Sequence, residues 1–481
     1  MVEFFDGTIL PMVLAFMSWA ILIGAVIYIP FRRSPVAAQA WLLLFFFLPW
    51  AALVVYLAVG NARHPKWRQD RLAKVPDIIR RAIAHMTLEG TGGMRTLRPH
   101  HRMTAHLVHR IGRFPCLADN RIVLDADYNR VVDRIAADID SARHHAHVMV
   151  YILQNDQAGN KVLSALERAA KRGVKCRLLI DAVGSSRDRK AIAKRLKNTG
   201  VELRLILPLR FWNQATRMDL RNHRKIVVVD GKIGWVGSQN MHRIEYEPKT
   251  FYRELMARVE GPVVLELQAI FIGDWYLETA EDIGSPELMP APEPPSAERT
   301  ATAQVLPSGP DYPESGVDIL FTDLIYSARQ RVVLATPYFI PNEPLLLAMR
   351  TAVSKGVRVT LFVTSTTNSL LIDRAQQSYY DELLEAGVEV MLYRERFLHA
   401  KHLSIDDDIA IIGSANMDRR SFELNSEVTL ISYSEDVVRD LRAIEDDYRT
   451  KSHRLNLEDW NKRGFLIQLG ENVTRLISPL L

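Results

Sequence analysis

The sequence HRKIVVVD at residues 223–230, followed by GSQN at 237–240, decides the fold because it occurs twice. The second copy reads HAKHLSID at 399–406 and is followed by GSAN at 413–416. The displacement from 223 to 399 is 176 residues, and the displacement from 240 to 416 is the same. Identities kept in one register across two separate blocks indicate an internal duplication of one supersecondary unit.

Each copy predicts a strand that carries two reactive side chains on one face. The run after Lys225 is apolar and β-branched, and it ends at Asp230-Gly231, which is typical of a two-residue hairpin turn. Residues at i and i+2 share a face of a strand, so His223 and Lys225 point the same way. Asp230 has the opposite parity, and a turn-forming carboxylate is its simpler interpretation. The return strand then brings GSQN back beside the histidine.

One copy therefore gathers an imidazole, an ammonium, a hydroxyl and an amide. The last three groups suit phosphate oxygens, and the imidazole suits nucleophilic or acid–base chemistry. Two copies would supply two imidazoles, one for each side of a phosphorus centre.

The pattern His-x-Lys-x4-Asp with Gly-Ser-x-Asn, present twice, resembles the phospholipase D superfamily from about residue 115 to the end. The resemblance implies that one histidine attacks phosphorus and forms a phosphohistidine, while the other protonates the leaving group and then activates the acceptor. It also implies that no metal or other cofactor takes part. The implied catalytic residues are His223, Lys225, Asp230, His399, Lys401 and Asp406, and the implied substrate-binding residues are Ser238, Asn240, Ser414 and Asn416.

In that superfamily a downstream acidic residue in each repeat orients its histidine, and Glu254 and Glu427 are the candidates. They break the 176-residue register, and a salt-bridged or solvated strand carboxylate is the alternative for both. The family's habit favours His223 as the nucleophile and His399 as the acid–base, although the symmetry of the motif itself assigns neither role.

The net positive charge of the chain favours an anionic binding partner. The chain of 481 residues has a net charge of +5 and a pI near 9.0, which suits lipid headgroups or nucleic acid. It contains only two cysteines, which do not make a disulfide framework, so a reduced compartment is the simpler expectation.

Two uncharged apolar runs, at 9–29 and 36–59, predict a transmembrane helical hairpin over residues 1–62. About 20 helical residues span the roughly 30 Å hydrocarbon core of a bilayer. A signal peptide is the alternative for the first run, but acidic rather than basic residues precede it. Basic residues after the second run outnumber the two arginines of the loop, which places the loop outside and the catalytic body in the cytoplasm.

The rest of the chain divides into four segments. Residues 63–114 are basic and read as irregular; they contain one histidine cluster, and a second lies at 144–147. Neither cluster has the spacing of a zinc site, so a solvated or interfacial role is favoured over a metal site. Strands alternate with helices over 115–285 and again over 304–481, and prolines over 286–303 indicate a linker. The prediction is an α/β fold of two phospholipase D-like repeats packed face to face.

The whole layout is similar to that of bacterial cardiolipin synthases, including the stretch LRNHRKIVV at 220–228 and the C-terminus SPLL at 478–481. This resemblance implies transfer of a phosphatidyl group from one phosphatidylglycerol to another, giving cardiolipin and glycerol. It implies a multi-pass protein of the bacterial inner membrane that acts on anionic lipid and not on nucleic acid, and it leaves a homodimer open. The alternatives are a membrane-anchored phospholipase D-type hydrolase or a nuclease that uses the same two histidines. A non-catalytic scaffold is disfavoured because both copies keep every reactive residue.

The repeats differ in the stretch that leads into the first motif. Residues 207–221 form an insertion that is both apolar and basic, with Phe211 and Trp212 near its middle. The composition suits the anionic headgroup layer, so we expect this insertion to dip into the membrane interface and guide a headgroup to the site. An ordinary surface loop is the alternative.

Overall fold

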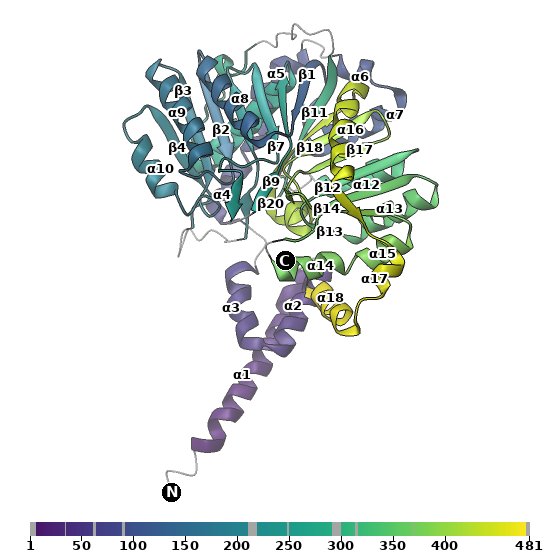
Figure 1. The fold of residues 1–481 in the computed structure, drawn as a ribbon. Coiled ribbons are helices and arrows are strands. Elements are labelled where there is room, and N and C mark those ends of the chain that lie inside the picture. Colours follow the sequence, from purple (N-terminus) through teal and green to yellow (C-terminus); the bar gives the residue numbers. More distant parts are fainter. Residues whose placement is uncertain are drawn as a thin grey trace.

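The computed structural model shows a large α/β body from which a bundle of N-terminal helices projects (Figure 1). It describes residues 6–33, 35–60, 64–88, 92–209, 219–247, 250–290, 300–312, 316–367 and 369–477. The mixed α/β class predicted from the sequence is confirmed.

The duplication is visible in the order of the strands. In the first half the spatial order is β4-β3-β2-β6-β7-β10-β1, and in the second half β11-β20-β18-β17-β12-β14-β15 repeats that order in reverse. The strands are β1 (Leu117–Asp125), β2 (His145–Val150), β3 (Lys175–Asp181), β4 (Val201–Ile206), β6 (Ile226–Val229), β7 (Ile233–Gly237), β10 (Met256–Glu260), β11 (Ala301–Ser308), β12 (Arg331–Thr336), β14 (Arg358–Thr364), β15 (Glu389–Tyr393), β17 (His402–Ile405), β18 (Ile409–Gly413) and β20 (Asn425–Ser432).

Helices cover the sheets of both halves, as the alternating sequence pattern predicts. In each half the parallel strands are joined by crossover helices, whose apolar faces pack on the sheet. The helices of the two halves are α8 (Tyr128–Ser141), α9 (Gln157–Lys171), α10 (Arg189–Leu196), α11 (Val263–Thr279), α12 (Val317–Ser327), α13 (Glu343–Ser354), α14 (Leu370–Gln377), α15 (Tyr380–Glu385) and α16 (Glu435–Thr450). Helix α11 is buried almost throughout and lies in a core shared by both halves.

The halves are joined edge to edge, which corrects the expectation that they simply pack face to face. Strand β1 pairs antiparallel with β11, so the two sheets form one 16-stranded sheet. Edge strands carry unpaired backbone groups, and this pairing satisfies them. Contacts of β7 with β18 and β20 add a second seam. Because β11 begins at Ala301, it includes the end of the predicted linker; residues 291–299 lie outside the described part of the chain.

The prediction of an irregular segment at 63–114 was wrong, because most of its described residues are helical. The helices are α4 (Lys66–Leu72), α5 (Val75–Leu88), α6 (Gly93–Thr96) and α7 (Pro99–Gly112). Helix α5 buries Val75, Ile78, Ile79 and Ala82 in the core shared with α11. These positions follow the i, i+3, i+4, i+7 spacing of one helix face, which the many basic residues of the segment concealed.

Of the second histidine cluster only His144 is exposed, so the expectation of a solvated or interfacial role was wrong for His145 and His147. His145 and His147 lie on β2 and are fully buried, and the His147 ring stacks on Phe271 of α11 at 4.4 Å between centroids. Burial lowers the pKa of His145 to about 4. The two rings are neutral core side chains between the sheet and the central helix.

Helix α1 (Asp6–Tyr28), continued by the short helix η1 (Ile29–Phe31), includes the span Leu10–Phe31, which is long and apolar enough to cross a membrane. In the part of the chain that the structure describes, it is the one helix that meets this condition.

The second apolar run does not form one spanning helix, so that prediction was wrong. It is divided into α2 (Pro35–Phe47) and α3 (Pro49–Val59), because Pro49 has no N–H and displaces Leu48 from helical geometry (φ −137°, ψ 62°). The two helices fold back: Arg33 Nε donates to Gly60 O at 2.8 Å, so the run starts and ends at the same level. Its tip reaches the middle of α1, where Trp50 Nε1 donates to Ser18 Oγ at 3.0 Å.

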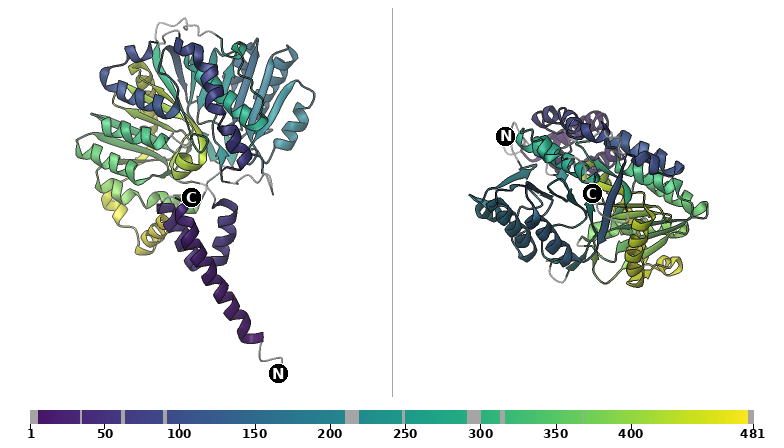
Figure 2. Two further views of the ribbon diagram at one scale, coloured as in Figure 1. Left: turned by 180° about the vertical axis from the view of Figure 1, so that it is seen from behind. Right: turned by 90° about the horizontal axis from the view of Figure 1, so that it is seen from above.

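The C-terminal segment returns to the same side of the body as the N-terminal helices, as both side views show (Figures 1 and 2). It consists of β21 (Ser452–Arg454), α17 (Leu457–Asn461) and α18 (Phe465–Ile477), and α18 packs against α14. The remaining short strands are β5 (Arg221–Asn222), β8 (Glu245–Glu247), β9 (Thr250–Arg253), β13 (Phe339–Ile340), β16 (Phe397–Leu398) and β19 (Met417–Asp418).

Candidate active site

The two motif histidines are placed by an exchange of short strands between the halves. Strand β5, just before His223, pairs in parallel with β20 of the second half, and β16, just before His399, pairs in parallel with β9 of the first half. The His223 amide donates to Ser426 O and the His399 amide donates to Arg253 O, both at 2.8 Å. Each histidine therefore emerges beside backbone of the opposite half.

Each histidine is also bonded to a carboxylate of the opposite half. His399 Nδ1 lies 2.7 Å from Glu254 Oε1, and His223 Nδ1 lies 3.1 Å from Glu427 Oε1. The sequence expectation that each glutamate orients the histidine of its own repeat is thus corrected, because the strand exchange brings the other histidine to it. With Nδ1 held by a carboxylate, Nε2 is the nitrogen left for chemistry.

Both histidines line one cleft of about 550 Å³ between the halves. Asn240 and Asn416 also line it, as the motif predicts. The other lining residues are Tyr151, Ile152, Arg221, His242, Tyr252, Tyr338, Ile340, Ser369, Leu371, Ile372, Asp418, Arg419, Arg420 and Asn425. Three arginines in this set give the cleft a positive character that suits phosphate.

Lys225 and Lys401 are buried next to the backbone of the two motif histidines. Each Nζ donates to the carbonyl oxygen of the histidine two residues before it, at 2.6 Å in both repeats. Burial lowers the pKa of Lys225 to about 8 and that of Lys401 to about 7. Neither lysine is among the residues that line the cleft; both are buried directly behind the histidines, and their lowered pKa values lie near the neutral range.

The two histidine–glutamate pairs differ in their hydrogen bonding. Glu427 accepts from the hydroxyls of Ser414 and Ser421 as well as from His223, and despite burial the interactions with His223, Lys225 and Ser414 lower its pKa. Glu254 Oε2 is buried with no hydrogen-bond partner among the described residues, and burial raises the pKa of Glu254 to about 8. Burial also lowers the pKa of both histidines, that of His223 to about 4. The lowered pKa of Glu427 favours its ionised form, whereas the raised pKa of Glu254 favours its protonated form.

Ser238 and Ser414, expected to bind substrate, do not line the cleft. Both are fully buried, and each accepts a backbone N–H at 3.0 Å, from Leu255 and Val428 respectively. Those amides follow Glu254 and Glu427 directly in the chain. The structure therefore gives the two serines a positioning role toward the glutamates.

Asp230 and Asp406 lie at the end of each motif strand away from the cleft. Asp230 accepts the backbone N–H groups of residues 143–145, each at 2.8 Å, and Asp406 accepts those of 329–331. Both have positive φ, 52° and 46°. The interpretation of Asp230 as a turn carboxylate is confirmed, and Asp406 occupies the same place in the second repeat: each fixes the start of the neighbouring strand.

His242 and Asp418 line the cleft, but the motif analysis did not single them out. They occupy equivalent positions, 176 residues apart, two places after the motif asparagines. Extending the register past the asparagine could have found them. His242 Nδ1 lies 3.0 Å from Tyr128 Oη, and burial lowers the pKa of His242 to about 4.

Part of the insertion before the first motif is buried rather than interfacial. Leu207 is 2% exposed, and Arg221 is 3% exposed and pairs with Asp181 at 3.4 Å. The expectation that these two ends contact the headgroup layer was wrong, because they belong to the protein interior. Phe211 and Trp212 lie outside the described residues.

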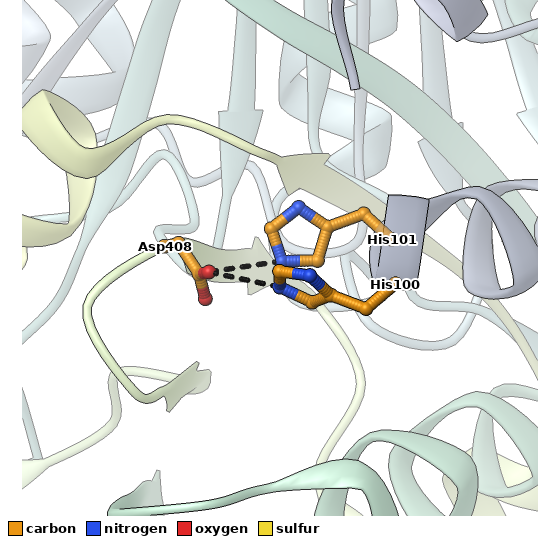
Figure 3. Close-up of side chains that lie close together, drawn as sticks. All are labelled: His100, His101 and Asp408. Carbon is orange, nitrogen blue, oxygen red and sulfur yellow. Dashed lines mark hydrogen bonds and ion pairs between the residues drawn. The ribbon is translucent and has the colours of Figure 1, made fainter. Parts of the chain in front are cut away.

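One group of side chains could hold a cation. His100 and His101 of α7 lie 3.3 and 3.0 Å from Asp408 in the turn between β17 and β18 (Figure 3). Arg98 also lies 3.3 Å from the same carboxylate oxygen, and a guanidinium there disfavours a bound cation. The arrangement is that of an ion-pair cluster that ties α7 to the second half, and none of its residues lines the cleft that holds the two histidines.

Comparisons with known proteins agree with this geometry. The family model described as "Cardiolipin synthase, PLD-like domain" matches residues 135–275 and 321–447. The chain is 32% identical to a cardiolipin synthase from Geobacillus kaustophilus, over 99% of this chain and 95% of that one. It is also 32% identical to cardiolipin synthase A from Serratia proteamaculans, over 98% and 99% of the two chains.

A solved structure shares the fold. The phosphatidylserine synthase of Haemophilus influenzae is 15% identical, covers 78% of this chain and 99% of its own, and superposes with a TM-score of 0.61. The family model and the full-length relatives together show that the chain belongs to the cardiolipin synthase family of phospholipase D-like enzymes.

Proposed function

We propose that this enzyme joins two phosphatidylglycerols into cardiolipin and glycerol through a phosphohistidine intermediate. The observation that carries the proposal is the cleft in which two imidazoles, each held at Nδ1 by a carboxylate, face one volume. Exchange of one phosphodiester for another needs a nucleophile, a proton carrier and charge stabilisation, and no energy-rich nucleotide.

In the first step His223 Nε2 attacks the phosphorus of one phosphatidylglycerol. The bond from phosphorus to the glycerol oxygen breaks, and His399 delivers a proton to that oxygen. In the second step a headgroup hydroxyl of another phosphatidylglycerol attacks the phosphorus while His399 accepts its proton. The phosphorus–nitrogen bond to His223 then breaks, and cardiolipin is released.

The difference between the two pairs supports this assignment. The ionised Glu427 accepts a hydrogen bond from Nδ1–H of His223. This bond increases the electron density at Nε2, which suits a nucleophile. The Glu254–His399 pair holds one more proton at neutral pH, which suits proton delivery to a leaving group.

The phosphoryl oxygens would be stabilised by Lys225, Lys401, Asn240 and Asn416. Negative charge increases on these oxygens in the transition state, and donors fixed beforehand at that place lower the barrier most. An approaching phosphate also favours the charged form of the lysines, whose pKa burial has lowered.

The proposed organisation keeps 1–62 as the membrane anchor, 63–114 as a basic connecting segment and 115–285 as the first repeat; the predicted linker at 286–303 is shortened to end where β11 of the second repeat begins at Ala301. We place the enzyme in the bacterial cell membrane with its body in the cytoplasm, in line with the basic residues after the anchor. One crossing by α1, with α2 and α3 dipping in and returning, replaces the two crossings expected from the sequence. Both motifs lie in one chain, so a homodimer is not needed to complete the site.

Purified full-length enzyme in vesicles of phosphatidylglycerol, with chelator present, would test the function. The expected products are cardiolipin and free glycerol in equal amounts. Phosphatidic acid as the main product would indicate the hydrolase alternative, and cleavage of DNA without lipid turnover would indicate the nuclease. Activity that disappears with chelator and returns with a divalent cation would contradict the metal-free mechanism.

A further inference from the structure

Helix α18 is amphipathic, but its polar face is turned toward the protein and its apolar face toward the outside, the reverse of a helix that covers a soluble core. Its polar residues face the protein: Glu471 is 1% and Thr474 is 6% exposed. Its apolar residues face outward, with Phe465 at 74% and Leu466 at 78% exposed. Ile467, Leu469, Val473 and Leu476 are also exposed. In water alone the apolar face would be expected to pack inward.

Ion pairs fix this orientation. Arg463, just before α18, contacts Asp381 at 2.8 Å and Glu471 at 2.6 Å, and Arg475 contacts Glu382 at 3.0 Å. Rotating α18 to bury its apolar face would break these pairs and leave Glu471 without its partner. The outward apolar face is therefore built into the fold.

The apolar surface continues from α18 onto the helix beneath it and reaches the catalytic cleft. Helix α14 packs against α18 and exposes Leu370 (70%) and Leu371 (40%). Leu371 and the neighbouring Ile372 also line the cleft that holds the two histidines. A continuous apolar path thus joins the outer face of α18 to the mouth of the site.

This surface lies on the side of the body from which α1, α2 and α3 project, in both side views (Figures 1 and 2). A lipid bilayer that contains α1 therefore meets the body on this side. An exposed apolar surface of this size indicates an interaction site, and here it lies on the same side of the body as the membrane anchor.

We propose that α14 and α18 form a docking platform that embeds in the lipid–water interface and holds the mouth of the cleft against the membrane. Acyl chains could then remain in lipid while the headgroup enters between the halves; this second part rests on the proposed function. The outward residues of α18 would lie at the depth of the upper acyl chains, as in helices that lie along a membrane.

The depth of the platform can be measured without reference to activity. The native Cys116 and Cys176 are buried, so Leu466→Cys can be labelled selectively with an environment-sensitive fluorophore in full-length protein. A matched label at Met103→Cys, 76% exposed on α7, serves as the control. In phosphatidylglycerol–phosphatidylcholine vesicles, a lipid-borne quencher should reach the label at 466 and an aqueous quencher the label at 103. Equal access of the aqueous quencher to both labels would overturn the docking, and so would a label at 466 protected from both quenchers, which would indicate a protein partner.

A kinetic comparison tests the delivery of substrate. Leu466→Glu should lower turnover of phosphatidylglycerol in bilayers about tenfold or more, because a charge opposes insertion of the apolar face. It should leave turnover of a short-chain, water-soluble phosphatidylglycerol unchanged, and Met103→Glu should change neither. Unchanged bilayer turnover would overturn the delivery role, and equal loss on both substrates would indicate damage to the site instead. Absence of cardiolipin even from unaltered enzyme would overturn the proposed function while leaving the quenching result intact.

Discussion

Glu254 and His399 are 145 residues apart in the chain, yet Glu254 Oε1 lies 2.7 Å from His399 Nδ1. The equivalent contact, between Glu427 and His223, crosses the same boundary in the opposite direction. The duplicated halves are therefore not two independent sites side by side. Each half contributes a histidine to one pair and a carboxylate to the other, so both halves are needed to complete either pair.

We expect His223→Ala and His399→Ala each to abolish cardiolipin formation. Each covalent step needs a nucleophile and a proton carrier, and loss of one group typically costs orders of magnitude in rate. With labelled phosphatidylglycerol, an acid-labile adduct should accumulate on His223 in the His399→Ala variant. An adduct found on His399 in the His223→Ala variant would reverse the assignment.

Replacement of the two glutamates by glutamine should slow different steps. Glu427→Gln removes the negative charge beside His223, so formation of the adduct should slow. Glu254→Gln keeps a neutral group beside His399, close to the protonated state present at neutral pH, and should have a smaller effect. Rapid-quench measurement of adduct formation distinguishes the variants. A larger loss of adduct formation in Glu254→Gln would contradict the assigned asymmetry.

Asp230→Ala should lower stability and largely spare the chemistry of the folded enzyme. The Asp230 carboxylate accepts three backbone amides, and loss of such bonds costs about 1–3 kcal/mol. Thermal unfolding measures the loss. Asp407→Ala is the control, because the Asp407 side chain is 60% exposed and accepts no backbone amide among the described hydrogen bonds. A Tm that falls no further for Asp230→Ala than for Asp407→Ala would argue against the turn role.

The kcat/KM should fall as pH rises above about 7–8. Burial lowers the pKa of Lys401 to about 7 and of Lys225 to about 8, so their charged forms are lost in that range. The stability contribution of these lysines has the opposite sign. Between the lowered pKa and the ordinary value of 10.5 the unfolded chain binds more protons, so stability rises with pH. Activity that fell together with the free energy of unfolding would point to denaturation rather than lysine titration.

The fold-back of α2 and α3 predicts that the N-terminus and the catalytic body lie on opposite sides of the membrane. A cysteine at Asp6 should react with an impermeant maleimide on intact spheroplasts, whereas one at Met103 should react only after permeabilisation. The native cysteines are buried and give little background. Reaction of both engineered cysteines only after permeabilisation would restore the hairpin with two crossings.

The sequence predicts the parts of this enzyme that are local. The motif strands, their shared face and the alternation of strands with helices follow from residue type and period. The cleft positions of His223, His399, Asn240 and Asn416 follow from the motif and its duplication.

The features that could not be predicted from the sequence are those that depend on which strands are neighbours in space. The exchange of β5 and β16 between the halves leaves no local signature, so the sequence pairs each glutamate with the histidine of its own repeat, whereas the structure pairs it with the other. Arg224, between two motif residues, is fully buried and pairs with Asp274 at 2.6 Å, a contact between residues 50 positions apart. Pro49 is a signal for a helix break, whereas the uninterrupted apolar composition of the run predicts one continuous helix; the structure follows the proline.

The exchanged strands also limit how this protein can be divided. A chain cut within 291–299 would yield two fragments that each retain a complete motif, but each histidine would then lack both its carboxylate and the backbone beside it. Neither fragment alone would have a complete histidine–carboxylate pair, because the other fragment carries the carboxylate. Mixing the two fragments could restore turnover only to the extent that they reassociate, so complementation would depend on concentration as the assembly of a heterodimer does. A substitution that disrupts one repeat is therefore expected to change the surroundings of both histidines.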